Sequence, residues 1–352
     1  MSDKVSDYHY ELPRDLIAQR PAKRRDEARL LVVPEIGPFG HHTIRDLVSL
    51  VRPGDLLVVN ESKVLPARLN GQKTTGARAE VLLLKPSGLG EDEDPALWEA
   101  LVRPGRKLRA GHVVEIGDEL SVEILEVLPS GNRLVRLKSD LDIETAIERN
   151  GSMPLPPYID REIEPSDRDR YQTVYARTGG SVAAPTAGLH FTNDLLEEFE
   201  TKGIKRTAIT LHVGLGTFRP VNAEHPSGHP MHIERYFIPE SAIEAVERTK
   251  RDGGRVWAVG TTAVRALESA ARDGGSLRPG WAQTDLFIWP PYNFRVVDGL
   301  LTNFHLPRST LIMLVAAFGG YERTMAAYEE AVRERYLFYS YGDAMLVVPS
   351  CG

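Results

Sequence analysis

Side chains suited to proton transfer and ligand binding recur beside glycine or proline in the second half of the chain. They fall in six segments: GGSVAAPTAGLHFT (179–192), LHVGLGTFRPV (211–221), HPMHIERYFIP (229–239), AVGTTAVRALES (258–269), WPPYNFRVVDGLLTNFHLPRST (289–310) and YSYGDAM (339–345). Histidine exchanges protons near neutral pH, and glycine lets the backbone approach a ligand closely. Because ligands of α/β proteins usually lie in loops that follow strands, these segments predict one convergent site.

The candidate residues lie in or beside these segments. The candidates for proton transfer are His190, His212, His305 and Glu234. The candidates for substrate binding are Thr186, Gly188, Gly214, Thr217, Thr261, Thr262, Arg265, Asp285, Tyr292 and Asn303. A histidine between apolar neighbours is more often a hydrogen-bonded structural residue than a catalytic one. The shared glycine, threonine and asparagine surroundings favour catalysis here.

The other motifs give weaker evidence for ligand binding. His225, His229 and His232 have spacings typical of metal ligands, but Pro226 and Pro230 prevent a continuous helix, so no metal site is predicted. GLGTF resembles part of a dinucleotide loop, but the chain has neither GxGxxG nor GxxxxGK[ST]. VGTT before a helix favours an anion site, with an ordinary helix start as the alternative.

The overall charge does not attract nucleic acid. The formal net charge is −6, so a polyanion must be held by a local basic run. RDLIAQRPAKRR (14–25) has five basic residues and one acid, and LVRPGRKLRAGH (101–112) has four and none. These runs supply the candidate contacts to nucleic-acid phosphates Arg24, Arg25, Arg103, Arg106, Lys107 and Arg109. The alternative is a solvated charged surface.

The pattern of elements predicts a mixed α/β domain interrupted by a small antiparallel β-barrel domain. Short apolar runs separated by turn residues fill about residues 64–140, and strands alternate with helices after residue 171. We expect the α/β domain in 1–63 and 151–352 and the barrel in 64–150. Asp140 or Asp142, Thr192 and Ser309 are predicted helix caps, Ser241 and Glu244 a capping box, and 285–289 a strand.

Composition limits other classes of protein. The 352 residues include one cysteine, Cys351, which excludes an internal disulfide and a zinc–cysteine cluster. The amino-terminal residues lack the apolar core of a signal peptide. The longest apolar run, residues 311–318, is far shorter than the ~20 residues of a membrane span. We therefore expect a cytoplasmic protein without membrane contact.

Long motifs across the chain resemble one known family. GSVAAPTAGLHFT, LHVGLGTF, MHIERY, LLTNFHLPRSTLIMLVAAF and YSYGDAML resemble the S-adenosylmethionine:tRNA ribosyltransferase-isomerases of queuosine biosynthesis. YELPRDLIAQRP, NESKVLPARLNG, WEALVRPGRKLRAG and PLPPYIDR extend this resemblance to nearly the whole chain. Two places depart from the family pattern: Pro290-Pro291-Tyr292 replaces a Pro-Gly-Tyr turn, and Asn60-Glu61-Ser62-Lys63-Val64 is an unusual form of its motif.

The resemblance implies a reaction. The ribosyl part of S-adenosylmethionine would move onto 7-aminomethyl-7-deazaguanine at the wobble position of tRNA, giving epoxyqueuosine, with release of methionine and adenine. It implies no metal, no cofactor beyond this co-substrate and no obligate protein partner.

The reaction assigns roles to the candidates. A neutral histidine, His212 or His190, would remove the acidic C5′ proton beside the sulfonium, and His305 or Glu234 would help adenine leave. Arg265 and the VGTT turn would hold the methionine carboxylate. The aromatic face of Tyr292 or Phe294, or a carboxylate, Glu234 or Asp285, would face the sulfonium.

Two other classes remain open from the sequence. One is a different S-adenosylmethionine enzyme, such as a methyltransferase, which would release S-adenosylhomocysteine. The other is a non-catalytic RNA-binding module, which would not need the histidine- and threonine-rich segments.

Overall fold

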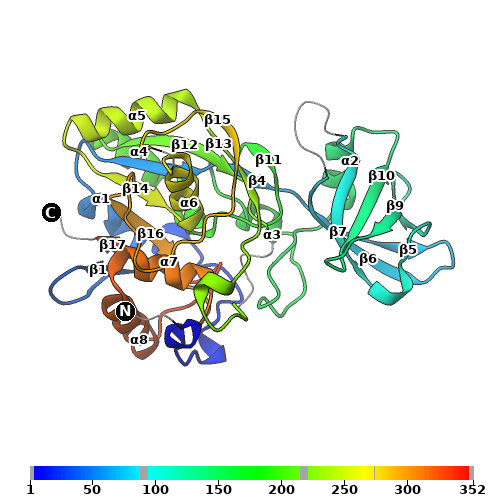
Figure 1. The fold of residues 1–352 in the computed structure, drawn as a ribbon, viewed down its shortest axis with the longest axis horizontal. Coiled ribbons are helices and arrows are strands. Elements are labelled where there is room, and N and C mark those ends of the chain that lie inside the picture. The colour runs from blue at the N-terminus through cyan, green and yellow to red at the C-terminus, as the bar shows by residue number, and fades with distance from the viewer. Residues whose placement is uncertain (1–3, 88–93, 215–220, 273, 349–352) are drawn as a thin grey trace.

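The structure is a computed structural model that describes residues 4–87, 94–214, 221–272 and 274–348 (Figure 1). The strands are β1 (Arg29–Pro34), β2 (Gly40–Thr43), β3 (Leu56–Asn60), β4 (Ser62–Val64), β5 (Arg68–Lys73), β6 (Arg78–Pro86), β7 (Leu97–Arg103), β8 (Val113–Ile116), β9 (Leu120–Val127), β10 (Arg133–Lys138), β11 (Thr178–Ser181), β12 (Lys205–Leu211), β13 (Glu234–Ile238), β14 (Val256–Val259), β15 (Gly280–Thr284), β16 (Gly299–Asn303) and β17 (Ala344–Val348). The α-helices are α1 (Leu47–Leu50), α2 (Ile143–Asn150), α3 (Asp167–Arg170), α4 (Asn193–Thr201), α5 (Glu240–Arg251), α6 (Thr261–Ala270), α7 (Thr310–Gly319) and α8 (Tyr321–Arg333).

A large mixed sheet forms the centre of the α/β domain. Its strand order is β15-β13-β12-β3-β14-β16-β17-β1-β2. The neighbours from β12 to β16 are parallel, β17 runs antiparallel to β16 and parallel to β1, and the outer strands β13, β15 and β2 pair antiparallel. The sheet unites strands from both ends of the chain, which confirms the predicted α/β class.

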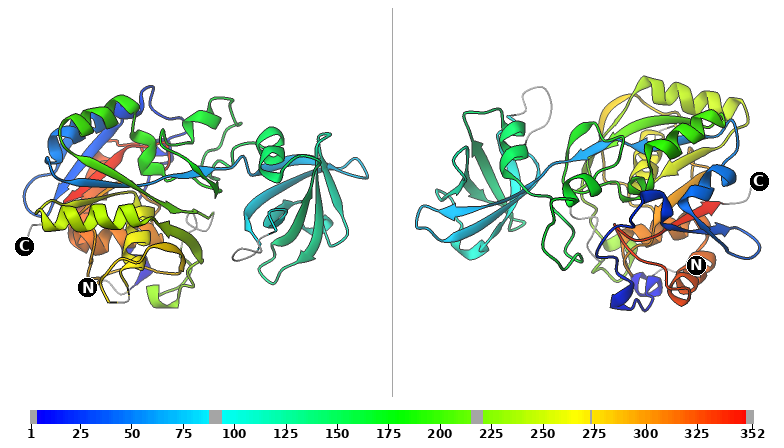
Figure 2. Two further views of the ribbon diagram at one scale, coloured as in Figure 1. Left: turned by 90° about the horizontal axis from the view of Figure 1, so that it is seen from above. Right: turned by 180° about the vertical axis from the view of Figure 1, so that it is seen from behind.

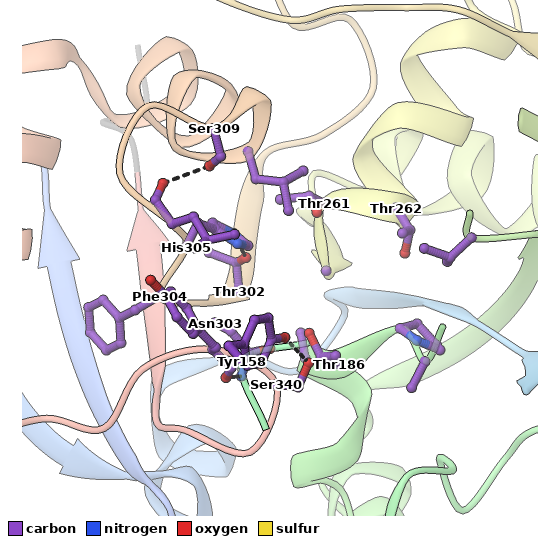
Figure 3. Close-up of a pocket in the computed structure, with 18 residues that line it drawn as sticks. Tyr158, Thr186, Thr261, Thr262, Thr302, Asn303, Phe304, His305, Ser309 and Ser340 are labelled. Carbon is purple, nitrogen blue, oxygen red and sulfur yellow. Dashed lines mark hydrogen bonds between the residues drawn. The ribbon is translucent and has the colours of Figure 1, made fainter. Parts of the chain in front are cut away.

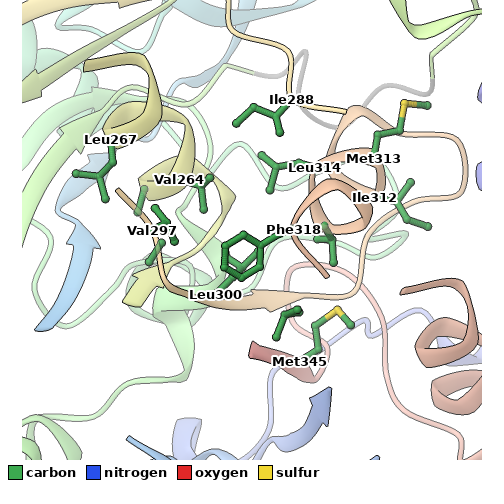
Figure 4. Packing of buried hydrophobic residues seen from close by; sticks show 14 of the residues in the cluster. Val264, Leu267, Ile288, Val297, Leu300, Ile312, Met313, Leu314, Phe318 and Met345 are labelled. Carbon is green, nitrogen blue, oxygen red and sulfur yellow. The ribbon is translucent and has the colours of Figure 1, made fainter. Parts of the chain in front are cut away.

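The central strands are apolar because both faces of the sheet are covered. Leu56 and Val58 of β3 belong to a core shared with α5, α6, α7 and α8, whereas Leu57 and Val59 belong to a second core with α1 and α4. A strand with helices on both faces reads as a continuous apolar run instead of an alternating one. Figure 4 shows part of the first core, where Val264 and Leu267 of α6 and Leu314 and Phe318 of α7 pack near Leu300 of β16.

The second unit is a closed antiparallel barrel of six strands in the order β10-β7-β6-β5-β8-β9. It stands beside the larger domain and joins it through the segments around β4 and after α2 (Figures 1 and 2). Alternate residues of β9 and β10, such as Val122, Ile124 and Val135, are buried in its own core. The barrel therefore has a core built mainly from its own strands, to which Val182 after β11 also contributes, and the predicted barrel is confirmed.

Three of the predicted helix caps are confirmed. The side chains of Asp142, Thr192 and Ser309 accept backbone N–H hydrogen bonds at the starts of α2, α4 and α7. The capping box of Ser241 and Glu244 is wrong, because α5 begins at Glu240, after Pro239, and Ser241 therefore lies inside the helix.

The predicted strand at 285–289 is also wrong. The strand is β15, which ends at Thr284. The N–H of Leu286 donates to Thr284 Oγ1 and its carbonyl accepts from Arg265 Nε, so side chains satisfy this backbone in place of a neighbouring strand.

The length and apolar character of the helices determine whether one of them could cross a membrane. Within the described residues, no helix is both long and apolar enough to cross a bilayer.

Candidate active site

Five of the six motif segments meet at one pocket, which we call pocket A (Figure 3). Its lining comprises residues 184–187, Val213, 260–262, 302–306, Ser309, Leu311, 339–340 and Tyr158. These residues come from the ends of β14 and β16, the starts of α6 and α7, and the loops before β17 and after the barrel. The convergence that the sequence predicts is thus present, and it is produced by strands that end at a common edge of the sheet.

Pocket A is neutral and rich in hydroxyl groups. Thr186, Thr261, Thr262, Thr302 and Ser340 line it, and its described lining contains neither a carboxylate nor a cationic side chain. An aromatic pair lies at one side, where the rings of Tyr158 and Tyr339 are 4.6 Å apart and the Tyr158 hydroxyl is 2.5 Å from Ser340 Oγ. Such a lining suits a neutral, polar, flat ligand.

The amino-terminal end of α6 forms one wall of pocket A. Gly260 precedes the helix with φ of 92°, a backbone conformation that favours glycine. Thr261 and Thr262 follow, and both are buried. The Thr262 hydroxyl has no hydrogen-bond partner within the described residues, although it lines the pocket. A buried hydroxyl without a partner is costly unless a ligand satisfies it.

His305 lies in the wall of pocket A. Its Nε2 is 2.7 Å from Thr302 Oγ1, and its backbone is held by the hydroxyls of Tyr10 and Tyr328. Burial lowers the pKa of His305 to about 3, because desolvation penalises the imidazolium. The ring is therefore neutral at cellular pH.

His190 does not line pocket A, but it is connected to the pocket through Asn303. Asn303 Nδ2 lies 3.2 Å from His190 Nε2 and donates to the carbonyl of Tyr339. Asn303 Oδ1 has no partner among the described residues. Burial, together with the charge of Arg25, lowers the pKa of His190 to about 4. Through Asn303, the neutral His190 ring can position a pocket residue.

A second pocket, pocket B, adjoins pocket A and shares Leu311 with it. Its lining comprises His229, Met231, His232, Glu234, Arg265, 286–288, Thr310, Leu311 and Leu314. Here Arg265 Nη1 and Glu234 Oε2 form a buried ion pair, and Gly214 N–H donates to Glu234 Oε1 over 3.1 Å. Arg265 Nη2 has no partner within the described residues. Pocket B therefore joins an apolar wall to a buried charge pair with one unused donor.

Several predicted residues lie elsewhere. His212 is outside both pockets and stacks on Trp281 with ring centroids 5.5 Å apart, and burial lowers its pKa to about 4. Asp285 is exposed and 3.5 Å from Arg272. Tyr292 packs on Phe294, 3.5 Å from a Glu268 oxygen. These positions do not support the sulfonium roles expected for Asp285 and Tyr292.

The predicted small residues Thr186 and Gly188 also lie in different surroundings. Thr186 lines pocket A, whereas Gly188 packs under Tyr175, whose hydroxyl would be 2.2 Å from an added Cβ. Thr217 lies outside the described residues, as does Cys351.

The side chains of the two basic runs differ in their exposure and in their contacts within the protein. Arg103, Arg106, Lys107 and Arg109 are exposed on the barrel. By contrast, Arg25 donates to the carbonyls of Gln172, Leu189 and Asp169, and Arg24 pairs with Asp26. The guanidinium of Arg25 therefore holds the segment that carries His190, and its predicted contact with tRNA is not supported.

The histidine-rich segment does not form a metal cluster in the described ranges. There, no group of three or more His, Cys, Asp or Glu side chains is placed to hold a metal ion. His229 and His232 instead line pocket B.

Several residues of pocket A are not among the candidates that the sequence predicts. Tyr158 is one of them, Tyr339 enters only as the first residue of the segment YSYGDAM, and Ser309 is predicted only as a helix cap. The available signal for Tyr158 is its position directly after two prolines, in PLPPY, because proline fixes its own φ and so restricts the backbone that leads to the tyrosine.

Comparison with known proteins identifies the family. The family model described as queuosine biosynthesis protein matches residues 5–347, so the chain belongs to this family. A protein of Trichlorobacter lovleyi, named S-adenosylmethionine:tRNA ribosyltransferase-isomerase, is 49% identical and covers 98% of this chain and 99% of its own length. A protein of the same name from Desulforamulus reducens is 47% identical over 98% of this chain and 100% of its own length.

A solved structure agrees with this family. The crystal structure of the S-adenosylmethionine tRNA ribosyltransferase of Thermotoga maritima is 37% identical and covers 97% of this chain and 100% of its own, with a TM-score of 0.55. The resemblance that the motifs predicted is confirmed over the full chain.

Proposed function

We propose that this chain is an enzyme that moves the ribosyl group of S-adenosylmethionine onto 7-aminomethyl-7-deazaguanine in tRNA. Its relatives, similar over nearly their whole length, carry the name of this activity. The structural observation that supports the proposal most is the pairing of two pockets, one neutral and hydroxyl-lined and the other charged.

Pocket A has the character that the adenosine half of S-adenosylmethionine requires. Adenosine is neutral and presents hydroxyls and an aromatic base. The hydroxyls of Thr261, Thr262 and Thr302 can bond to the ribose or the ring nitrogens, and the Tyr158–Tyr339 pair offers an aromatic surface. The unpartnered Thr262 Oγ1 and Asn303 Oδ1 would gain partners from this ligand.

Pocket B has the character that the methionine half requires. The amino-acid end carries one negative and one positive charge, which match Arg265 Nη2 and Glu234 respectively. Met231, Leu286, Ile288 and Leu314 provide an apolar wall for the side chain of methionine. Both pockets touch Leu311 and are therefore adjacent, so we place one S-adenosylmethionine molecule across them.

His305 is the histidine of the described pocket A lining and is our choice for proton transfer. The neutral ring would take the acidic C5′ proton beside the sulfonium, and the imidazolium would return it to a nitrogen of the departing adenine. The pKa that burial lowers makes the neutral ring a weak base and its protonated form a strong acid, so the acidity of the C5′ hydrogen beside the sulfonium drives the first transfer and the return of the proton is favourable. The aminomethyl nitrogen of the tRNA base then bonds to a sugar carbon and loses a proton to solvent. A sugar oxygen replaces sulfur at C5′ to form the epoxide, and the electron pair of the broken C5′–S bond leaves with methionine. His190 would position Asn303 in this scheme.

The remaining parts of the proposal concern partners and location. The exposed basic residues of the barrel would bind tRNA phosphates. The scheme needs no metal, no further cofactor and no obligate protein partner, and it places the protein with tRNA in the cytoplasm.

One experiment separates this function from its alternatives. The protein is incubated with S-adenosylmethionine and tRNA that carries the aminomethyl-deazaguanine, and small molecules and nucleosides are analysed by mass spectrometry. We expect adenine, methionine and epoxyqueuosine, before and after treatment with EDTA. Release of S-adenosylhomocysteine would indicate a methyltransferase, and release of nothing would indicate a binding module.

A further inference from the structure

An aromatic and cationic surface lies on the outer side of strands β12, β13 and β15, away from the core that these strands share with α5 and α6. Leu211 and Tyr236 point into that core and are buried. Their neighbours alternate to the other side, as the pleat of a strand requires. The surface, which we call the Trp281 surface, consists of His212, Arg235, Phe237 and Trp281.

The rings of this surface are ordered against one another. Trp281 is 50% exposed and stacks on His212 with an interplanar angle of 18°. Arg235 lies over the Trp281 ring at 5.0 Å, and the Phe237 ring is 5.2 Å away. Ile233, the residue before β13, is 58% exposed. Tryptophan is enriched at interfaces, so a half-exposed ring held by stacking and by an arginine indicates a contact surface.

The backbone beneath the surface is built to hold the histidine ring. Gly180 has φ of 121°, and a Cβ at that position would lie 2.8 Å from His212 Cε1. The His212 ring is therefore enclosed between the Gly180 backbone and Trp281. Only a glycine lets the chain approach the ring this closely.

Three chain segments connect the surface directly to the two pockets. His212 precedes Val213, which lines pocket A, and Arg235 follows Glu234, which lines pocket B. Gly180 precedes Ser181, whose hydroxyl accepts from Val213 N–H over 2.9 Å, and the same segment reaches pocket A at Ala184. Because successive residues of a strand face opposite sides, the surface and the pocket linings lie on opposite faces of the sheet and are joined at the end of β12 and the start of β13. An RNA loop that reaches the pockets around these strand ends would lie close to Trp281.

We propose that the Trp281 surface binds an unstacked base of the tRNA loop next to the nucleotide that enters the pockets. This inference rests on the proposed function. An enzyme that acts on a base must take it out of the stack, which leaves its neighbours without their stacking partners. Proteins bind such bases by stacking them on aromatic rings and by pairing arginine with the phosphates or the ring faces. Trp281 and Arg235 supply both groups beside the pockets.

The test measures binding of a labelled anticodon stem–loop RNA that carries the aminomethyl-deazaguanine to the full-length protein. Stacking of one base on an aromatic ring corresponds to roughly 5- to 150-fold in affinity. We therefore expect Trp281→Ala to raise the Kd for this RNA within that range. Trp281→Phe, which keeps a ring, should bind within about threefold of the parent. Ile36→Ala is the matched control. Ile36 is an 85% exposed apolar residue between β1 and β2, far from Trp281 in the sequence.

Two further measurements define the outcome. The affinity of Trp281→Ala for S-adenosylmethionine and its melting temperature should match those of the parent. RNA should quench the tryptophan fluorescence of Trp281→Phe less than that of the parent. An unchanged RNA affinity in Trp281→Ala would overturn the inference, as would an equal loss of affinity for both ligands. If the parent protein itself releases no adenine with tRNA present, the proposed function fails; an active parent with an unaffected Trp281→Ala variant rejects only the surface.

Discussion

At the scale of single residues, the two pockets differ in the charge of the side chains that line them. Neutral hydroxyls and aromatic rings gather in pocket A, and the buried pair of Glu234 and Arg265 marks pocket B. Buried charges are costly unless they are paired, so a buried arginine with an unused donor indicates a ligand that carries an anion. This residue is the clearest target for mutation.

We predict that Arg265→Lys mainly weakens binding of S-adenosylmethionine. Lysine keeps the charge beside Glu234 but lacks the second guanidinium donor. A hydrogen bond to a charged group is worth about 1.5–3 kcal/mol, so the KM should rise roughly 10- to 150-fold while kcat changes little. Arg272→Lys, in an exposed pair with Asp285, is the control and should resemble the parent. Steady-state kinetics would refute the assignment if both variants behaved alike.

The buried histidines should make the free energy of unfolding depend on pH. The pKa of His190 falls to about 4 in the folded state, against an ordinary value near 6.5. Between these values the unfolded chain binds more protons, so the free energy of unfolding decreases as the pH falls from about 6.5 to 4. The slope for one such histidine is about 1.4 kcal/mol per pH unit.

Urea unfolding across this pH range should therefore be less pH-dependent in His190→Gln than in the parent. His9→Gln serves as the control, since His9 is exposed beside Glu11. Parallel pH profiles for His190→Gln and the parent would contradict the prediction.

At the scale of elements, helix starts both stabilise the fold and shape the site. Ser309 Oγ accepts from Ile312 N–H at the start of α7 and donates to the carbonyl of Leu306, and Ser309 also lines pocket A. Thr192 Oγ1 accepts from Leu195 N–H at the start of α4, outside either pocket lining. The same local motif thus serves stability alone in one helix and stability plus site geometry in the other.

We predict that Ser309→Ala and Thr192→Ala each lower the free energy of unfolding by about 1 kcal/mol, the usual cost of losing a cap. Only Ser309→Ala should also raise the KM for S-adenosylmethionine, because it releases the start of α7 beside pocket A. Chemical unfolding and kinetics on both variants check this. An equal KM for the two variants would show that the α7 cap has no part in binding.

At the scale of the whole molecule, the barrel and the sheet domain have separate cores and contribute different surfaces. The exposed Arg103, Arg106, Lys107 and Arg109 lie on the barrel, whereas both pockets lie in the sheet domain. Phosphate contacts can therefore be removed without touching the pockets.

We predict that changing these four barrel residues to glutamate weakens tRNA binding and flattens its salt dependence. Each lost phosphate contact reduces the slope of log affinity against log salt by about 0.7 to 0.9. Affinity for S-adenosylmethionine should stay unchanged. Arg248→Glu with Arg251→Glu on α5, which changes the net charge by half as much, is the control for charge reversal away from the barrel. Should tRNA binding persist while affinity for S-adenosylmethionine falls, the barrel run has another role.

The sequence alone determined the features that short segments carry. Alternating and continuous apolar runs gave the barrel and the two-sided sheet, and Asp142, Thr192 and Ser309 gave helix starts, because caps and periodicity act within a few residues. The glycine-rich segments also marked where the site would form. The error at Asp285–Trp289 arose because side chains satisfied that backbone in place of a neighbouring strand.

Only the tertiary structure decided which side chains meet. His212 and Val213 are adjacent in the chain, yet Val213 lines pocket A and His212 stacks on Trp281, since successive strand residues face opposite sides. Glu234 and Arg265 form their pair across 31 residues of chain, and Tyr158 reaches Tyr339 from the connector after the barrel. Such encounters depend on how distant segments pack together, and no local pattern of residue types encodes them.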